Sequence, residues 1–150
     1  MKKNLLNQQA TEKMISRANA LQATSKPQWG EMTVTEMLLH CNLANNQILD
    51  GDIEYRKTTF KQRLIKILAL YIVPNFPKNM KSEPKNITKG RIGPEEFENQ
   101  RTLFIKTIQK FAMTTDPINL THPAFGNLDA REWGIAAWKH TDHHLRQFGV

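Results

Sequence analysis

The sequence has one cysteine, Cys41, so no intramolecular disulfide can form, and we expect a reducing, cytoplasmic location. Seven glycines and seven prolines in 150 residues are few enough to favour a helical globular fold. No apolar run reaches the ~18–20 residues that a membrane-spanning helix needs. The first residues carry two lysines but no apolar stretch typical of a secretory signal. We therefore expect a single domain over residues 1–150.

Acidic residues are scarce between positions 56 and 91. This segment holds ten of the 21 Lys and Arg residues but only one of the 14 acidic residues, Glu83, so its net charge is +9 and that of the rest of the chain is −2. Such a segment is either a solvated surface or a surface for an anionic substrate, a nucleic acid or an anionic membrane. Residues 78–91 lack the interleaved aromatic groups that stack on bases, which disfavours a nucleic acid. We favour an anionic small-molecule substrate.

Four stretches repeat apolar residues at the spacing of an amphipathic helix: 2–22, 33–50, 94–112 and 129–148. The second and the last begin with capping-box pairs, Thr33 with Glu36 and Asp129 with Glu132. The apolar positions of the third helix include either Leu103 or Phe104. Residues 114–128 are expected to form a loop. The pattern predicts an all-α fold, a four-helix bundle.

An extra short helix over 60–73 and a long basic loop over 74–94 are expected between the second and third bundle helices. The short helix is thoroughly apolar on one side, so we expect it to pack over the bundle or to form a homodimer contact. An interfacial membrane helix is the alternative. Cys41 is expected to face the core as a small apolar group, because its sequence neighbour His40 points about 100° away round the helix and no other activating base is evident.

The last predicted helix places two imidazoles on its core-facing stripe, which consists of Trp133, Ala137, His140, His144 and Phe148. Histidines four residues apart have Cβ atoms about 5–6 Å apart, so their ring nitrogens can reach one metal ion. The alternative is a pair of hydrogen-bonded core histidines. His143 lies about 60° round the helix from His140, which predicts a position at the rim of the site.

A third ligand must come from His40 or His122, the remaining histidines. His40 lies about 10 Å into its own amphipathic helix, near the middle of the bundle. His122 precedes the last helix and reaches the pair only if its loop folds back. His40 is therefore the better candidate. Three histidines from two helices would leave coordination positions open for water or substrate, with space above Ala137 and a wall from Trp133.

The stretch from Trp29 to His40 and the pattern H-x-x-H-H-x-x-Q at 140–147 resemble the DinB/YfiT-like superfamily of proposed metalloenzymes. The stretches HPAFG at 122–126, EWG at 132–134 and RQFG at 146–149 resemble one branch, a domain of unknown function. The resemblance implies a four-helix bundle, often dimeric, whose divalent metal is held here by His40, His140 and His144. Relatives include transferases and isomerases that use a low-molecular-weight thiol. The basic insertion at 56–91 departs from the common length of the superfamily.

These observations lead to two hypotheses. The first is a metal-dependent transferase or hydrolase in which Zn²⁺, or alternatively Ni²⁺, Fe²⁺ or Mn²⁺, lowers the pKa of a bound thiol or water. Asn42, Asp142 and Gln147 would orient the ligand rings. The second is a non-enzymatic helical module that binds a partner, with structural or vestigial histidines.

Overall fold

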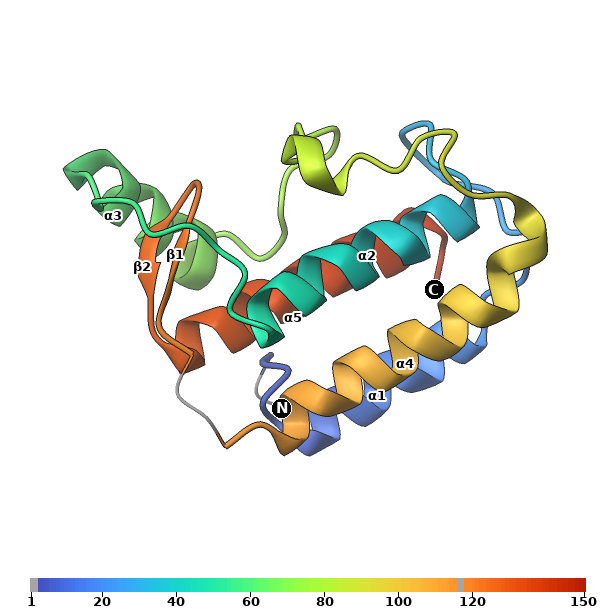
Figure 1. Cartoon of the computed structure of the whole chain (residues 1–150), viewed down its shortest axis with the longest axis horizontal. Helices are drawn as coiled ribbons and strands as arrows, with labels where there is room; N and C mark the ends of the chain where they lie inside the picture. The colour runs from blue at the N-terminus through green and yellow to red at the C-terminus, as the bar shows by residue number, and fades with distance from the viewer. Residues whose placement is uncertain (1–2, 116–117) are drawn as a thin grey trace.

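A computed structural model describes residues 3–115 and 118–150, and these residues are mostly helical with one small sheet (Figure 1). The long helices are α1 (Gln8–Asn19), α2 (Val34–Leu49), α4 (Phe97–Met113) and α5 (Ala130–Gln147). The short helical elements are α3 (Phe60–Ile67), η1 (Leu68–Ile72), η2 (Pro84–Asn86) and η3 (Pro94–Glu96). The strands β1 (Leu120–His122) and β2 (Gly126–Leu128) form an antiparallel hairpin.

Both predicted capping boxes are confirmed. The Thr33 hydroxyl accepts from the Glu36 amide at 3.2 Å, and the Glu36 carboxylate accepts from the Thr33 amide at 2.8 Å. Asp129 and Glu132 make the equivalent pair at the start of α5. Each box satisfies amide groups that the first helical turn leaves without partners, and so determines where its helix begins.

The four long helices pack against one another, with α2 between α4 and α5, and α1 against α4 and α5. Figure 1 shows that α2 and α4 run in the same direction, whereas α5 runs antiparallel to α2. Two parallel neighbours require a long connection, because the end of the first helix and the start of the second lie at opposite ends of the bundle. The segment between Leu49 and Phe97 makes this return, which explains why it is so long.

The core lies between the long helices. Fully buried side chains come from all four of them, including Met14, Met37, Leu38, Phe104, Ile108 and Leu145. Phe104, and not the 43% exposed Leu103, belongs to this core. Cys41 is buried with its Sγ 3.8 Å from the sulfur of Met37, and burial raises the pKa of its thiol. The prediction of a packing role for Cys41 is therefore confirmed.

The predicted helix at 60–73 exists as α3 followed by the wider turn η1, and it ends before Pro74. Lys139 of α5 holds η1 by donating to the carbonyls of Ala69 and Val73, each at 2.5 Å. The outward side chains are exposed: Phe60, Leu64, Ile67, Leu68, Tyr71 and Ile72. Only the inner side of this helix thus packs on the protein, and the homodimer contact stays a prediction.

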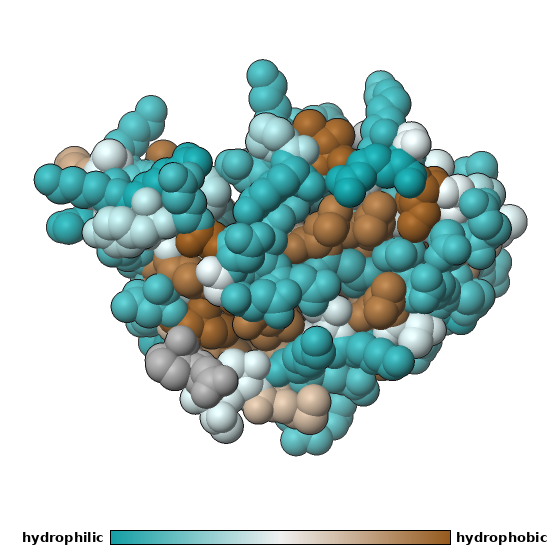
Figure 2. Space-filling view, in the orientation of Figure 1, coloured by the Kyte–Doolittle hydropathy of each residue, from teal (hydrophilic) through white to brown (hydrophobic). Residues whose placement is uncertain are grey.

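Figure 2 shows apolar residues in the middle of the visible face, surrounded by hydrophilic ones. The protein has a net charge of +7, but this face is not polar throughout. Within residues 3–115 and 118–150, no helix combines the length and the apolar character needed to cross a membrane.

Two expectations about the elements need correction. The first helix is shorter than the predicted 2–22, because residues before Gln8 bond to α5: the Leu5 amide donates to the Gly134 carbonyl at 3.0 Å. The fold is not purely all-α, because β1 and β2 form a sheet within the predicted loop at 114–128. Strands of three residues are too short to show an alternating pattern. Residue 2 of the predicted first helix, and Asp116 and Pro117 of the predicted loop, lie outside the described residues.

Gly134 provides a test of this packing. An alanine here would gain up to about 1 kcal/mol of helix propensity. Its Cβ, however, would overlap the Asn4 carboxamide oxygen and lie 2.9 Å from Leu6 Cγ. We expect Gly134→Ala to lower the free energy of unfolding by about 1–3 kcal/mol, measured by urea denaturation. The double variant Asn4→Ala/Gly134→Ala should recover part of the loss, whereas a stabilised single variant would contradict this close approach.

Candidate metal centre

The antiparallel helices α2 and α5 bring three histidines together. The Nε2 atoms of His40 and His140 are 3.0 Å apart, and one nitrogen from each of His40, His140 and His144 lies within 4.8 Å of the others. The ring centroids are 4.7–5.0 Å apart, with the rings tilted or edge-on to one another. The three residues that the sequence nominated therefore form one cluster.

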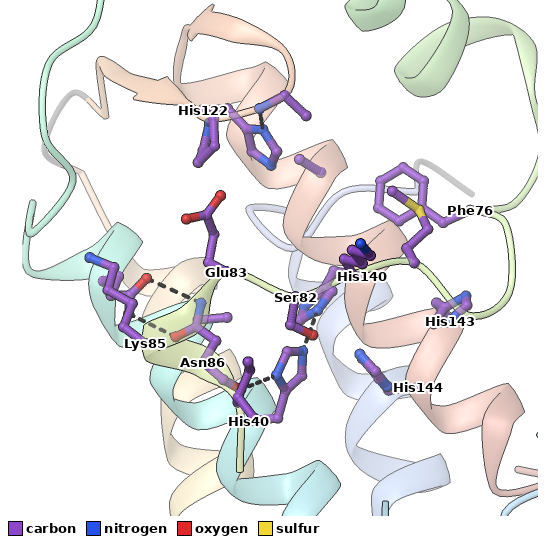
Figure 3. Close-up of a pocket in the computed structure, with 18 of the residues that line it drawn as sticks. His40, Phe76, Ser82, Glu83, Lys85, Asn86, His122, His140, His143 and His144 are labelled. Atoms are coloured by element: carbon purple, nitrogen blue, oxygen red, sulfur yellow. Dashed lines mark hydrogen bonds between the residues drawn. The ribbon is translucent and has the colours of Figure 1, made fainter. Parts of the chain in front are cut away.

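A backbone carbonyl orients the His40 ring. Its Nδ1 lies 2.7 Å from the carbonyl oxygen of Asn86, which can only accept a hydrogen bond, so Nδ1 carries the proton. The neutral ring then has its lone pair on Nε2, the atom that faces His140. Figure 3 shows this bond joining α2 to residues 74–94, which we call the crossing segment.

Two successive hydrogen bonds orient the His144 ring. Its Nδ1 lies 2.8 Å from the Gln147 carboxamide oxygen, and the Gln147 amide group donates to the Trp29 carbonyl at 2.8 Å. This chain fixes the direction of the Gln147 amide, so His144 Nδ1 is the donor and its Nε2 lone pair is free. Gln147 thus occupies the ring-orienting position that the sequence predicted. Outer hydrogen bonds of this kind fix the tautomer of metal-binding histidines.

The surroundings keep the cluster uncharged. Burial lowers the pKa of His40 and lowers the pKa of His144 to about 3. Burial and the neighbouring imidazoles hold the pKa of His140 well below its ordinary value. Neutral imidazole is the form that binds a metal ion, so protons do not compete for the cluster at neutral pH.

A cavity of about 950 Å³ opens beside the three histidines. Figure 3 shows the histidines on one side, and residues of the crossing segment, among them Phe76 and Glu83, around the space in front of them. Trp133 and Ala137 of α5 line the same cavity, as predicted for a wall and a small residue beside the ligands. The cavity gives a small molecule access to the cluster.

His143 and His122 lie near the cluster but outside it. His143 is buried, lines the cavity and packs edge-on against Trp29, with ring centroids 5.5 Å apart. This position agrees with the predicted rim. His122, the less favoured candidate for the third ligand, lies at the end of β1 and lines the cavity from another side.

Asn42 and Asp142 were expected to orient the ligand rings, but their side chains bond elsewhere. Asn42 donates to the Gln100 carbonyl at 3.1 Å and so joins α2 to α4. The Asp142 carboxylate accepts from Arg17 at 2.7 Å and from Arg146 at 2.8 Å. Both residues are close to the histidines in the sequence, but the helical spacing does not show which neighbouring helix each side chain faces.

The sequence did not predict that the crossing segment packs along α2 and orients a ligand ring. Thr88 donates to the Glu36 carbonyl at 2.8 Å, and the Gly90 amide donates to the Glu36 carboxylate at 2.6 Å. The side chains of Gln47 and Asn86 also bond at 2.8 Å. These bonds fasten the segment along α2 and place the Asn86 carbonyl on His40. A backbone carbonyl has no sequence signature, so no motif could have revealed it.

The donor set suits a divalent transition metal. Two nitrogens bound to one tetrahedral Zn²⁺ lie about 3.3 Å apart, close to the spacing of the Nε2 atoms of His40 and His140. Both rings with an assigned tautomer direct a lone pair into the cluster. Three imidazoles would leave at least one coordination position free, and all three histidines line the cavity.

The fold and site define a mostly helical protein with a three-histidine cluster at the base of a cavity. Residues 1–149 match the family described as "Protein of unknown function (DUF1569)", and the chain belongs to this family. No curated protein and no solved structure matches the chain.

The lowered pKa values predict how the metal-free protein responds to acid. An unfolded histidine binds a proton below about pH 6.5, whereas buried His144 stays neutral down to a pKa of about 3. The unfolded state therefore binds more protons, and the free energy of unfolding should fall as the pH drops from 7 to 5. Each such histidine contributes a slope that approaches about 1.4 kcal/mol per pH unit. Urea denaturation across this range measures the slope.

His144→Gln should reduce this slope, because it removes one titrating group from the folded and unfolded states. A free energy of unfolding that does not change between pH 7 and 5 would contradict the burial of neutral imidazoles.

Proposed function

We propose that the protein is a metal-dependent enzyme whose divalent ion is held by His40, His140 and His144. The observation that carries the proposal is the fixed tautomer of two of these rings. The Asn86 carbonyl and the Gln147 side chain each hold an Nδ1–H, which leaves the Nε2 lone pairs of His40 and His144 directed into one cluster. The resemblance to the DinB/YfiT-like superfamily, with its four-helix bundle, supports the same assignment.

The bound ion would supply a lowered pKa for a thiol or a water molecule at its open position, as in transferases or hydrolases. Zn²⁺ suits a set of three neutral imidazoles, and Ni²⁺, Fe²⁺ and Mn²⁺ are the alternatives. The protein residues have three tasks. The relays through Asn86 and Gln147 keep the ligands oriented, the apolar side chains around the cavity limit water, and the crossing segment shapes the entrance.

Metal content tests this proposal. Untagged protein should contain about one transition-metal ion per chain by elemental mass spectrometry, directly or after incubation with Zn²⁺ and dialysis. His40→Ala and His144→Ala should each abolish stoichiometric binding, because two imidazoles hold the ion too weakly to survive dialysis.

His143→Ala is the matched control, since His143 is a buried histidine of the same helix outside the cluster, and it should keep its metal. Protein that binds neither Zn²⁺ nor Ni²⁺, or a His144→Ala variant that retains a full equivalent, would refute the site. The non-enzymatic hypothesis would then be preferred.

Gln147 gives a finer test. Gln147→Leu removes the acceptor of the His144 Nδ1–H, so the affinity for Zn²⁺ should fall by about 10- to 100-fold in a chelator competition titration. Asn42→Leu is the control, because Asn42 bonds to α4 and not to the cluster. It should change the stability of the fold but leave the Zn²⁺ affinity within about twofold. Equal losses of affinity in the two variants would show that Gln147 has no specific role.

A further inference from the structure

The hairpin between β1 and β2 holds His122 in one tautomer. The backbone amides of Ala124 and Phe125 both point at His122 Nδ1, at 3.0 and 3.3 Å. An amide N–H can only donate, so Nδ1 must be the acceptor and the proton of the neutral ring lies on Nε2. Protonation of Nδ1 would break both bonds. The hairpin thus holds His122 as a neutral ring with its N–H on Nε2.

Aromatic neighbours fix the direction of this ring. Phe125 stacks on it with centroids 4.1 Å apart, and Trp133 lies 5.3 Å away with its own indole N–H bonded to the Leu120 carbonyl. Burial lowers the pKa of His122 to about 4, in agreement with the neutral form. Figure 3 shows the ring reaching from the hairpin into the cavity, on a different side from the three histidines. No residue in 3–115 or 118–150 accepts a hydrogen bond from Nε2.

The charged group that faces His122 across the cavity is a carboxylate. Glu83 turns its carboxylate toward the His122 side of the cavity (Figure 3). Lys85 donates to the Asp52 carbonyl at 3.2 Å. The other cavity-lining charges are Lys81 and two ion pairs, Arg56 with Glu54 and Lys89 with Glu31. Despite the basic composition of residues 56–91, this end of the cavity therefore offers a neutral donor beside a carboxylate.

We propose that His122 determines the specificity of the cavity by donating its Nε2–H to an uncharged carbonyl oxygen of the substrate, in an amide, ester or ketone. This inference rests on the proposed function, because the rest of the substrate would then lie toward the three-histidine cluster. The aromatic groups of Phe76, Phe125 and Trp133 would contact its apolar body. A carboxylate or phosphate bound to His122 would be repelled by the Glu83 carboxylate, whereas a neutral carbonyl oxygen would not.

Nuclear magnetic resonance of ¹⁵N-histidine-labelled protein tests the tautomer first. At pH 7, His122 should show a protonated Nε2 and a bare Nδ1 in both the metal-free and the Zn²⁺-loaded protein. A proton on Nδ1, or a doubly protonated ring, would overturn the proposal.

Binding of matched probes tests the specificity. Acetophenone and benzamide, which carry a neutral carbonyl, should shift the His122 Nε2 resonance and bind about three- to tenfold more tightly than α-methylstyrene and benzoate. His122→Phe should abolish the preference for acetophenone over α-methylstyrene, while His122→Gln, which retains an N–H donor, should restore part of it. Tighter binding of benzoate, or no shift at His122 with any probe, would overturn the proposal.

Metal content separates this inference from the proposed function. His122→Phe should keep its helical circular dichroism and its full equivalent of Zn²⁺, because His122 is outside the cluster. Loss of the carbonyl preference with metal retained would support His122 alone. Probe binding by a protein that takes up no metal would refute the proposed enzyme and leave the role of His122 intact.

Discussion

The parallel direction of α2 and α4 is the constraint from which the site follows. Neighbouring helices that run the same way cannot be joined by a short turn, so the chain must return from the end of the first helix to the start of the second. The return segment is fastened to α2 through Thr88 and Gly90, and this places its Asn86 carbonyl on His40. The same segment carries Phe76 and Glu83 to the cavity. The connection that completes the fold also encloses the candidate metal centre.

Burial of polar groups explains the internal arrangement of that centre. An imidazole removed from water is destabilising unless its N–H finds a partner. His40 and His144 meet this requirement on one nitrogen only, through Asn86 and Gln147. His122 has the opposite arrangement, because two backbone amides donate to its Nδ1 and its Nε2–H is left for a ligand. The cavity therefore contains lone pairs on one side and a neutral donor on another, a division of roles suited to holding a cation and orienting a carbonyl compound.

The sequence predicted the long helices well, because their apolar spacing and capping pairs are local features. It also identified the three clustered histidines, since two of them share a helical stripe and His40 lies at the middle of another amphipathic helix. The short strands escaped prediction because three residues cannot show a period of two. Asn42 and Asp142 were misplaced because a helical wheel gives the angle of a side chain but not its partner helix.

The sequence by itself determined the mostly helical class, the helix starts at Thr33 and Asp129, and the candidate ligands, because each depends on residue types at short, regular spacing. Only the tertiary structure decided that α5 runs antiparallel to α2, which tautomer each of His40, His144 and His122 adopts, and that the basic segment covers a cavity. These features depend on backbone carbonyls and amides brought together from distant parts of the chain. Such groups are the same in every residue, so their positions cannot be read from side-chain patterns.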